Sequence, residues 1–313
     1  MTVHLVPFLH FQWPAMLAPR SNNMPWNTFA AICLFVSFSH GAALSNLSAI
    51  EQLLLSSRLT KIQNAVATKF QSAVGPQLLE RSAKDVTIIF PGAGGRDAIS
   101  DELEESLRRS SASTHNAFVT TFDWQEHRGT VLTAAYDSET VGETVGKCLW
   151  EVMNGASLQL RSVHCVGISV GAFGANGMAR EICSRRGSAS RDGESSPYVR
   201  LTLLAPFTSR GVTGSSYGPD NFGTNADYAV QYMTKEDPVP TTDKKLPQCT
   251  RYDITSSRTK DDFVLPDGES MHCWPVAYYA RHGIEDERAR FGEALVRHDD
   301  GIGLERGAVV KVE

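Results

Sequence analysis

The feature that most constrains the fold is a serine placed between two glycines where a strand gives way to a helix. The pentapeptide Gly167-Ile168-Ser169-Val170-Gly171 follows a run typical of a short buried strand, Ser162 to Val166. It precedes a small, helix-compatible run, Ala172 to Arg180. Side chains at the two glycine positions would hold strand and helix apart, and so sharp a turn strains the backbone of the serine. The pattern predicts a nucleophilic serine presented on a strand-to-helix elbow.

Apolar runs bounded by turn residues alternate with helical stretches along the rest of the chain. Strands are expected at 85–90, 117–123, 162–167, 199–204, 228–234 and 251–254. Helices are expected from Ala98 to Ser110, and from Ser138 onward, where valine and leucine recur at near-helical spacing. Strands that alternate with helices predict an α/β fold with a mostly parallel central sheet and helices on both faces. With the serine elbow added, the expected architecture is the α/β-hydrolase fold.

Composition and charge limit the classes of function. The chain has 313 residues, of which 21% are charged and 42% hydrophobic, as in an ordinary globular protein. The simplest organisation is one α/β-hydrolase domain over residues 46–313. The net charge of -5 comes from interspersed signs and leaves no basic face, which argues against a nucleic-acid partner.

The first 45 residues form a separate N-terminal segment. An apolar run at 28–38 is followed by small residues, with a cleavage site expected near Ala43. This is the layout of a signal peptide, and the run is short for a bilayer span. We therefore expect a secreted or secretory-pathway protein, with a disordered or membrane-associated tail as the alternative. In an oxidising compartment, Cys249 and Cys273 in the late loops are candidates for a disulfide.

A serine nucleophile needs donors for the oxyanion, and these are expected just after a strand. The glycine-rich run Pro91-Gly92-Ala93-Gly94-Gly95 directly follows the strand at 85–90. Glycine lets backbone N–H groups approach a negative oxygen closely. The predicted oxyanion hole is the N–H of Ala93 with that of Val170. A plain tight turn is the alternative, whereas a phosphate loop is disfavoured because the Gly-Lys-Ser/Thr ending is missing.

The base is expected among the histidines that follow the serine, because this fold has the chain order serine, acid, histidine. Of the nine histidines, His272, His282 and His298 remain. His272 lies in a loop after the last expected strand, and an aromatic segment follows that can pack it in place. His282 is better explained as the solvated end of a helix. His164, inside the elbow strand, is expected to be a packed or hydrogen-bonded core residue.

The acid is predicted to be Asp237, which comes shortly after the strand at 228–234. Pro238 follows it and restricts the backbone of the turn. Asp220 in the preceding loop is the alternative acid, and a solvated turn residue is its other interpretation.

Four segments resemble the catalytic domain of the pancreatic and lipoprotein lipase family. They are Phe122-Asp123-Trp124 with Ala134-Ala135-Tyr136, the glycine-containing pairs Val141-Gly142 and Val145-Gly146, the elbow Val163 to Ala172, and His272 with Ala277 and Tyr279. The resemblance implies that Ser169 is the nucleophile and His272 the base. It also implies hydrolysis of a carboxylic ester, with lipid esters among the candidates.

The sequence departs from that family at the acid. The family takes its acid from a Leu-Asp-Pro turn, and the matching turn here is Leu204-Ala205-Pro206. Asp237-Pro238-Val239-Pro240 instead resembles the Asp-x-Val-Pro turn of fungal-type lipases, one strand further on. We interpret the acid as relocated to Asp237.

The sequence thus predicts a serine hydrolase that cleaves esters through an acyl-enzyme with the triad Ser169, Asp237 and His272, and that requires no cofactor or metal. The expected partner is a small-molecule or lipid ester, with transient contact to a lipid surface possible. Phe173, Phe207, Tyr217 and Trp274 are candidates for an acyl pocket or for the core. Two alternatives stay open: an inactive binding protein with a hydrolase fold, and a thioesterase or acyltransferase that uses the same triad.

Overall fold

The computed structural model describes residues 49–112, 114, 116–130, 133–189, 196–210, 214–291 and 306–313. The predicted signal peptide within residues 1–45 lies outside these residues. In the part of the chain that the structure describes, no helix is long and apolar enough to cross a membrane.

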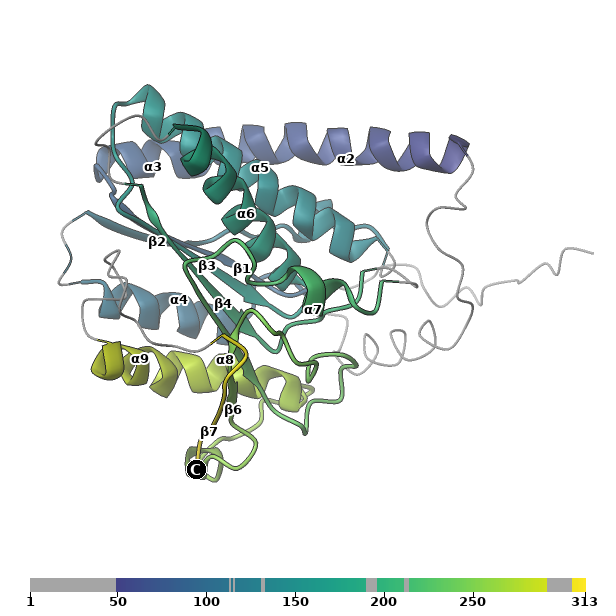
Figure 1. Cartoon of the computed structure of the whole chain (residues 1–313), viewed down its shortest axis with the longest axis vertical. Helices are drawn as coiled ribbons and strands as arrows, with labels where there is room; N and C mark the ends of the chain where they lie inside the picture. Colours follow the sequence, from purple (N-terminus) through teal and green to yellow (C-terminus); the bar gives the residue numbers. More distant parts are fainter. Residues whose placement is uncertain are drawn as a thin grey trace, which may run out of the picture.

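A single parallel sheet of seven strands forms the centre of the molecule, in the order β2-β1-β3-β4-β5-β6-β7 (Figure 1). The strands are β1 (Asp85–Phe90), β2 (Ala117–Thr121), β3 (Ser162–Ile168), β4 (Tyr198–Leu204), β5 (Tyr228–Met233), β6 (Thr250–Asp253) and β7 (Val309–Lys311). Because all are parallel, the loops that follow β1, β3, β5 and β6 leave from the same edge of the sheet.

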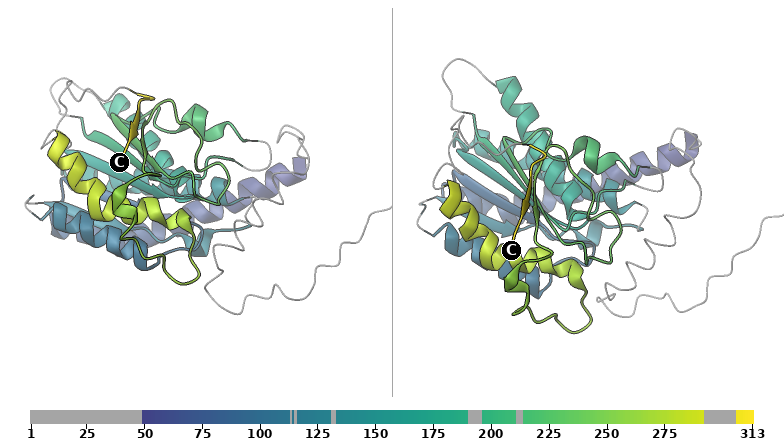
Figure 2. Two further views of the ribbon diagram at one scale, coloured as in Figure 1. Left: turned by 90° about the horizontal axis from the view of Figure 1, so that it is seen from below. Right: turned by 60° about the horizontal axis from the view of Figure 1, so that its bottom comes forward.

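Helices cover both faces of the sheet (Figures 1 and 2). One face carries α2 (Ala49–Lys69), η3 (Phe70–Val74), α3 (Gly75–Glu80), α5 (Ala134–Gly155) and α6 (Gly171–Ala189). The other face carries α4 (Ala98–Ser110), α8 (Trp274–Tyr278), η7 (Tyr279–Gly283) and α9 (Ile284–Phe291). The remaining short elements lie in loops: η4 (Gln125–His127), α7 (Tyr217–Asn221), η5 (Arg258–Lys260) and η6 (Met271–Cys273).

Alternating side chains of each strand supply the core on the two faces. On β1, Ile88 belongs to the core beneath α5 and α6, whereas its neighbour Ile89 belongs to the core beneath α4. The helix α4 adds Leu103 and Leu107 to the second core. A capping box between Asp97 and Ser100 fixes the start of α4 next to the loop that follows β1.

Most elements lie where the sequence predicts them. The strand at 85–90 and the helix from Ala98 to Ser110 are confirmed, and β2 ends two residues before the predicted boundary. Two boundaries differ. The helix α5 begins at Ala134 and not at Ser138, and α6 continues to Ala189, beyond the helix-compatible run that ends at Arg180.

The predicted pairing of Cys249 with Cys273 is wrong, since both are free, buried thiols. Cys249 packs beneath Gly223, and the Cys273 thiol donates a hydrogen bond to the carbonyl of Ser270 at 3.0 Å. The two thiols thus have separate local contacts and form no disulfide with each other. Cys165 is also a free, buried thiol.

Candidate active site

The turn at Ser169 has the strained geometry that its glycines predict. Ser169 has φ 54°, in the left-handed region that side chains other than glycine rarely adopt. A Cβ atom on Gly167 would lie 2.6 Å from Cα of Ala172, and one on Gly171 would lie 2.2 Å from the carbonyl oxygen of Phe90. Only glycine fits at either position, and a strained residue of this kind costs about 1–3 kcal/mol.

A buried imidazole–carboxylate pair lies at the ends of β5 and β6. Nδ1 of His272 is 2.7 Å from Oδ2 of Asp237, and their side chains are 3% and 1% exposed. The other carboxylate oxygen, Oδ1, accepts a hydrogen bond from the N–H of Val239 at 2.8 Å. Both oxygens of Asp237 are therefore held, which fixes the carboxylate against the ring.

Local structure brings these two residues together. Met233, the last residue of β5, pairs with Asp253, the last residue of β6, so the loops after these strands start side by side. His272 lies in η6, where the Ser270 hydroxyl accepts from the His272 N–H at 3.4 Å. Trp274, buried two residues after His272, packs on Phe263 with ring centroids 4.8 Å apart. The aromatic segment thus anchors the histidine loop.

The alternative acid and base lie elsewhere. Asp220 is exposed on α7, and its N–H donates to the carbonyl of Ser216. His282 lies in η7 with its ring 5.5 Å from that of Tyr278. At the position of the lipase-family acid, Ala205 is buried with φ 45°, and its N–H donates to the carbonyl of Tyr232. The side chain that contacts His272 is that of Asp237.

The glycine-rich loop after β1 packs against the elbow. The close approach of Gly171 to the carbonyls of Phe90 and Pro91 puts the elbow beside this loop. Within the loop, the Trp124 indole donates to the carbonyl of Pro91 at 2.8 Å, and the Arg128 guanidinium donates to the carbonyl of Ala93. These contacts fix the loop that carries the Ala93 amide.

Arg128 is a residue that the sequence analysis missed. It lies shortly after β2, the neighbour of β1 in the sheet, so its side chain reaches the loop that follows β1. The sequence did contain a signal for it, because Arg128 follows the end of a predicted strand, and the site was expected where the strands end.

The site is closed in this structure. Ser169 is 0% exposed, and its hydroxyl has no hydrogen-bond partner among the described residues. The N–H of Phe207 donates to the carbonyl of Ser169 at 3.1 Å. Ile168, which precedes the serine, and His272 line one small pocket, so the elbow and the histidine loop converge. A dry site of this kind strengthens electrostatic interactions within it.

The candidate acyl-pocket residues pack into aromatic clusters. Phe173 stacks on Tyr217 with centroids 5.4 Å apart and meets the edge of Phe222 at 5.0 Å. Phe173 and Trp274 are fully buried, whereas Phe207 and Tyr217 are partly buried against the core. Phe173 and Trp274 therefore belong to the core.

A second polar cluster lies deeper on the α9 face of the sheet. It comprises His164, Arg200, Thr202, Tyr232, Tyr279 and Glu287 and is called the Glu287 network below. Glu287 accepts hydrogen bonds from the Tyr232 hydroxyl at 2.9 Å, the Arg200 guanidinium at 3.1 Å and the Tyr279 hydroxyl at 3.3 Å. Burial raises the pKa of Glu287, against the opposing effect of Arg200.

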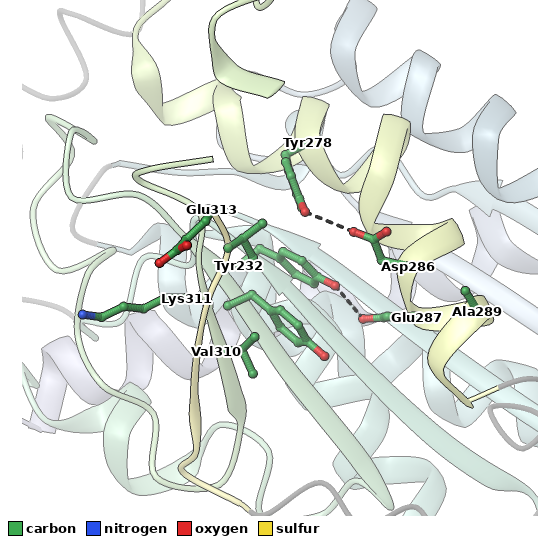
Figure 3. Close-up of a pocket in the computed structure, with 10 residues that line it drawn as sticks. Tyr232, Tyr278, Asp286, Glu287, Ala289, Val310, Lys311 and Glu313 are labelled. Atoms are coloured by element: carbon green, nitrogen blue, oxygen red, sulfur yellow. Dashed lines mark hydrogen bonds between the residues drawn. The ribbon is translucent and has the colours of Figure 1, made fainter. Parts of the chain in front are cut away.

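A pocket opens beside the Glu287 network, between α9 and the edge strand β7 (Figure 3). In it, the hydroxyl of Tyr232 points to Glu287, and that of Tyr278 points to Asp286 at 3.1 Å. These carboxylates are therefore already engaged by phenols. Among the described residues, no three metal-ligating side chains gather into a group.

His164 lies at the inner end of the Glu287 network, as the predicted core histidine. Its Nε2 is 2.8 Å from the Thr202 hydroxyl, and burial, followed by the nearby charge of Arg200, lowers its pKa well below the usual value. Among the hydrogen bonds of the described residues, no carboxylate bonds to this imidazole.

Comparisons with known proteins do not show a family for this chain. No family model and no curated protein matches the sequence. Among solved structures, a Trichoderma reesei cutinase in complex with a C11Y4 phosphonate inhibitor is 13% identical, with a TM-score of 0.35 over 86% of this chain and 100% of that one. The parallel seven-stranded sheet, the helices on both faces and the strained serine turn identify the fold as the α/β-hydrolase fold.

Proposed function

We propose that this protein is a serine hydrolase that cleaves carboxylic esters, with Ser169 as nucleophile, His272 as base and Asp237 as the acid that orients it. The observation that carries the proposal is the buried His272–Asp237 pair, 2.7 Å apart, in the loops beside the strained Ser169 elbow. A structural histidine does not require a carboxylate fixed on both oxygens, whereas a base that must become positively charged does.

In the first step, Ser169 attacks the ester carbonyl as His272 takes the hydroxyl proton. The Oγ–carbon bond forms, and the carbonyl oxygen becomes an oxyanion that the N–H groups of Ala93 and Val170 stabilise. Asp237 keeps the ring in the tautomer that presents Nε2 to the serine. The carbon–oxygen bond to the alcohol then breaks, and the alcohol leaves with the proton from His272.

In the second step, water attacks the acyl-enzyme while His272 takes its proton. The acyl–Oγ bond breaks, the acid is released, and the proton returns to Ser169. The complete reaction consumes one ester and one water, and it gives one acid and one alcohol. Since Ser169 is fully buried in this structure, the residues that cover it must shift to admit a substrate.

The test combines labelling with hydrolysis. The full chain is treated with a fluorophosphonate probe, and methyl esters of short and long acids are titrated for released acid at constant pH. We expect labelling and hydrolysis in the wild type and loss of both in Ser169→Ala, with unchanged circular dichroism. Hydrolysis that persists in Ser169→Ala would refute the assignment.

The full burial of Ser169 also favours a second function, a binding protein that has the fold without the activity. That alternative predicts no labelling of the wild type at any probe concentration. Parallel assays of thioesters and of acyl transfer to alcohols separate an esterase from a thioesterase or acyltransferase.

A further inference from the structure

Arg128 bonds to the glycine-rich loop at the residue that carries a proposed oxyanion donor. Its guanidinium donates to the carbonyl of Ala93, in a turn that the Gly95 N–H closes onto the carbonyl of Gly92 at 3.0 Å. Ala93 is buried, and a hydrogen bond from a charged donor is stronger than one between neutral groups. The contact therefore fixes the peptide group that directly follows the Ala93 N–H.

The backbone on both sides of Arg128 is held by one ion pair. Asp137, in the first turn of α5, has a fully buried side chain, and its two carboxylate oxygens accept from Arg58 of α2 at 3.1 and 3.0 Å. Oδ2 of Asp137 also accepts from the Gly129 N–H at 2.9 Å. The Arg58 guanidinium donates to the carbonyl of His127 at 3.4 Å. Arg128 thus lies between two residues anchored on the same pair, which restricts the directions in which its side chain can extend.

The same turn of α5 also contacts the helix that follows the elbow. The hydroxyl of Ser138, next to Asp137 in sequence, accepts from the N–H of Gly174 in α6 at 3.0 Å. The helix α6 begins at Gly171, directly after Val170, whose N–H is the second proposed oxyanion donor. The first turn of α5 is therefore connected to both segments that carry the proposed donors.

We propose that Arg128 is a positioning residue for the oxyanion hole and that the Arg58–Asp137 pair holds it in place. The inference rests on the proposed ester hydrolysis and extends that site to residues outside the triad. Arg128 keeps the Ala93 N–H where it and the Val170 N–H can bond to one oxyanion. Misplacing a group at the reacting centre by about 1 Å can lower the rate roughly 100-fold. Because negative charge on this oxygen develops in the transition state, the loss belongs in kcat and not in KM.

Arg128→Met tests the inference on the full chain, because it removes the donor and keeps an unbranched side chain. Hydrolysis of methyl hexanoate gives kcat and KM, and inhibition by an alkyl trifluoromethyl ketone gives Ki. The ketone forms a reversible adduct in which its carbon bonds to Oγ of Ser169, its oxygen becomes an oxyanion, and His272 takes the hydroxyl proton. We expect kcat to fall roughly 10- to 100-fold and Ki to rise by a similar factor, with KM within about twofold of the wild type.

Three further variants separate positioning from folding. Arg128→Lys, which keeps a cationic donor, should recover most of the lost kcat. Asp137→Asn, which removes the charge that holds Arg58, should change kcat and Ki in the same directions by a smaller factor, independently of any change at Arg128. Glu143→Gln is the matched control, because Glu143 is another acidic residue of α5 and its ion-pair partner is Arg180 of α6. It should leave kcat, KM and Ki unchanged.

Circular dichroism checks the fold of each variant. A lower kcat in Arg128→Met with an unchanged Ki would mean a smaller fraction of folded enzyme, and it would overturn the inference. Wild-type kcat in both Arg128→Met and Asp137→Asn would overturn it as well. If the wild type had no Ser169-dependent hydrolysis, the proposed function itself would be refuted, and the role of Arg128 with it.

Discussion

The predicted triad and the Glu287 network lie on one sheet, and each contains a buried carboxylate and a buried histidine. The two regions differ in the hydrogen-bond partners of these groups. At the strand ends, Asp237 bonds to the imidazole of His272 directly. In the Glu287 network, the carboxylate bonds to two phenols and a guanidinium, and His164 bonds to a hydroxyl.

The difference shows what a buried histidine needs in order to move protons. Burial disfavours the charged imidazole, and a nearby anion offsets that cost. Among the hydrogen bonds of the described residues, His164 has no such anion, and burial holds its pKa well below the usual value. Burial likewise raises the pKa of Tyr232 well above its usual value. The Glu287 network can hold the sheet and α9 together, whereas the pair at the strand ends can serve as a base.

The largest expected effect breaks the pair at the strand ends. Asp237→Asn should lower kcat for methyl ester hydrolysis by roughly 10⁴-fold, because an amide stabilises the wrong imidazole tautomer and no longer balances the imidazolium charge. Compared with the wild type, this substitution should affect the free energy of unfolding much less than it affects kcat. Steady-state kinetics and urea unfolding of the same preparation measure both.

Asp220→Asn is the matched control, since Asp220 is the exposed alternative acid on α7. It should retain wild-type kcat. If Asp220→Asn lost the activity and Asp237→Asn kept it, the assignment of the acid would be wrong.

The second prediction concerns the Glu287 network, where a substitution should lower the stability and leave kcat nearly unchanged. Glu287→Ala removes the acceptor of Arg200, Tyr232 and Tyr279, and leaves the Arg200 charge without its carboxylate. Removing one partner of a buried pair costs about 3–5 kcal/mol. We expect that loss in urea unfolding, with kcat per folded molecule nearly unchanged. Glu285→Ala, at an exposed neighbouring position on α9, should cost little. A large loss of kcat in folded Glu287→Ala would contradict a structural role.

Much of the triad region could be predicted from sequence because its signals are local. Each signal reports the backbone geometry that a few neighbouring residues must adopt. These signals are the glycines around Ser169, the glycine-rich run at Ala93 and the proline after Asp237. The position of Asp237 after the strand at 228–234 favours it over Asp220, and in the structure its carboxylate contacts His272.

The Glu287 network could not be predicted in the same way. Its members come from β3, β4, β5, η7 and α9, and their contacts exist only once those elements pack. Arg200 and Thr202 alternate with buried leucines on β4, a pattern that reads from sequence as an ordinary half-exposed strand. The strand β7 was missed because its three residues carry too little periodicity. The burial of Ser169 could not be predicted either, since it depends on how distant segments pack around the elbow.

The smallest expected effect concerns the response of His164 to pH. The pKa of His164 is lowered in the folded protein. As the pH falls, the imidazole therefore binds a proton in the unfolded chain before it does so in the folded chain. The stability linked to His164 is therefore complete above its unfolded pKa of about 6.5, and it is lost as the pH falls below that value. Each pH unit in that window changes the free energy of unfolding by at most about 1.4 kcal/mol.

Urea unfolding of His164→Asn, which can still bond to Thr202, tests this between pH 5 and 7. The free energy of unfolding should vary less steeply with pH in this variant than in the wild type. His282→Asn, on the partly exposed turn after α8, serves as the control and should keep the wild-type slope. An unchanged slope in His164→Asn would mean that this imidazole is protonated in the folded state, and the contrast drawn between the two regions would fail at that residue.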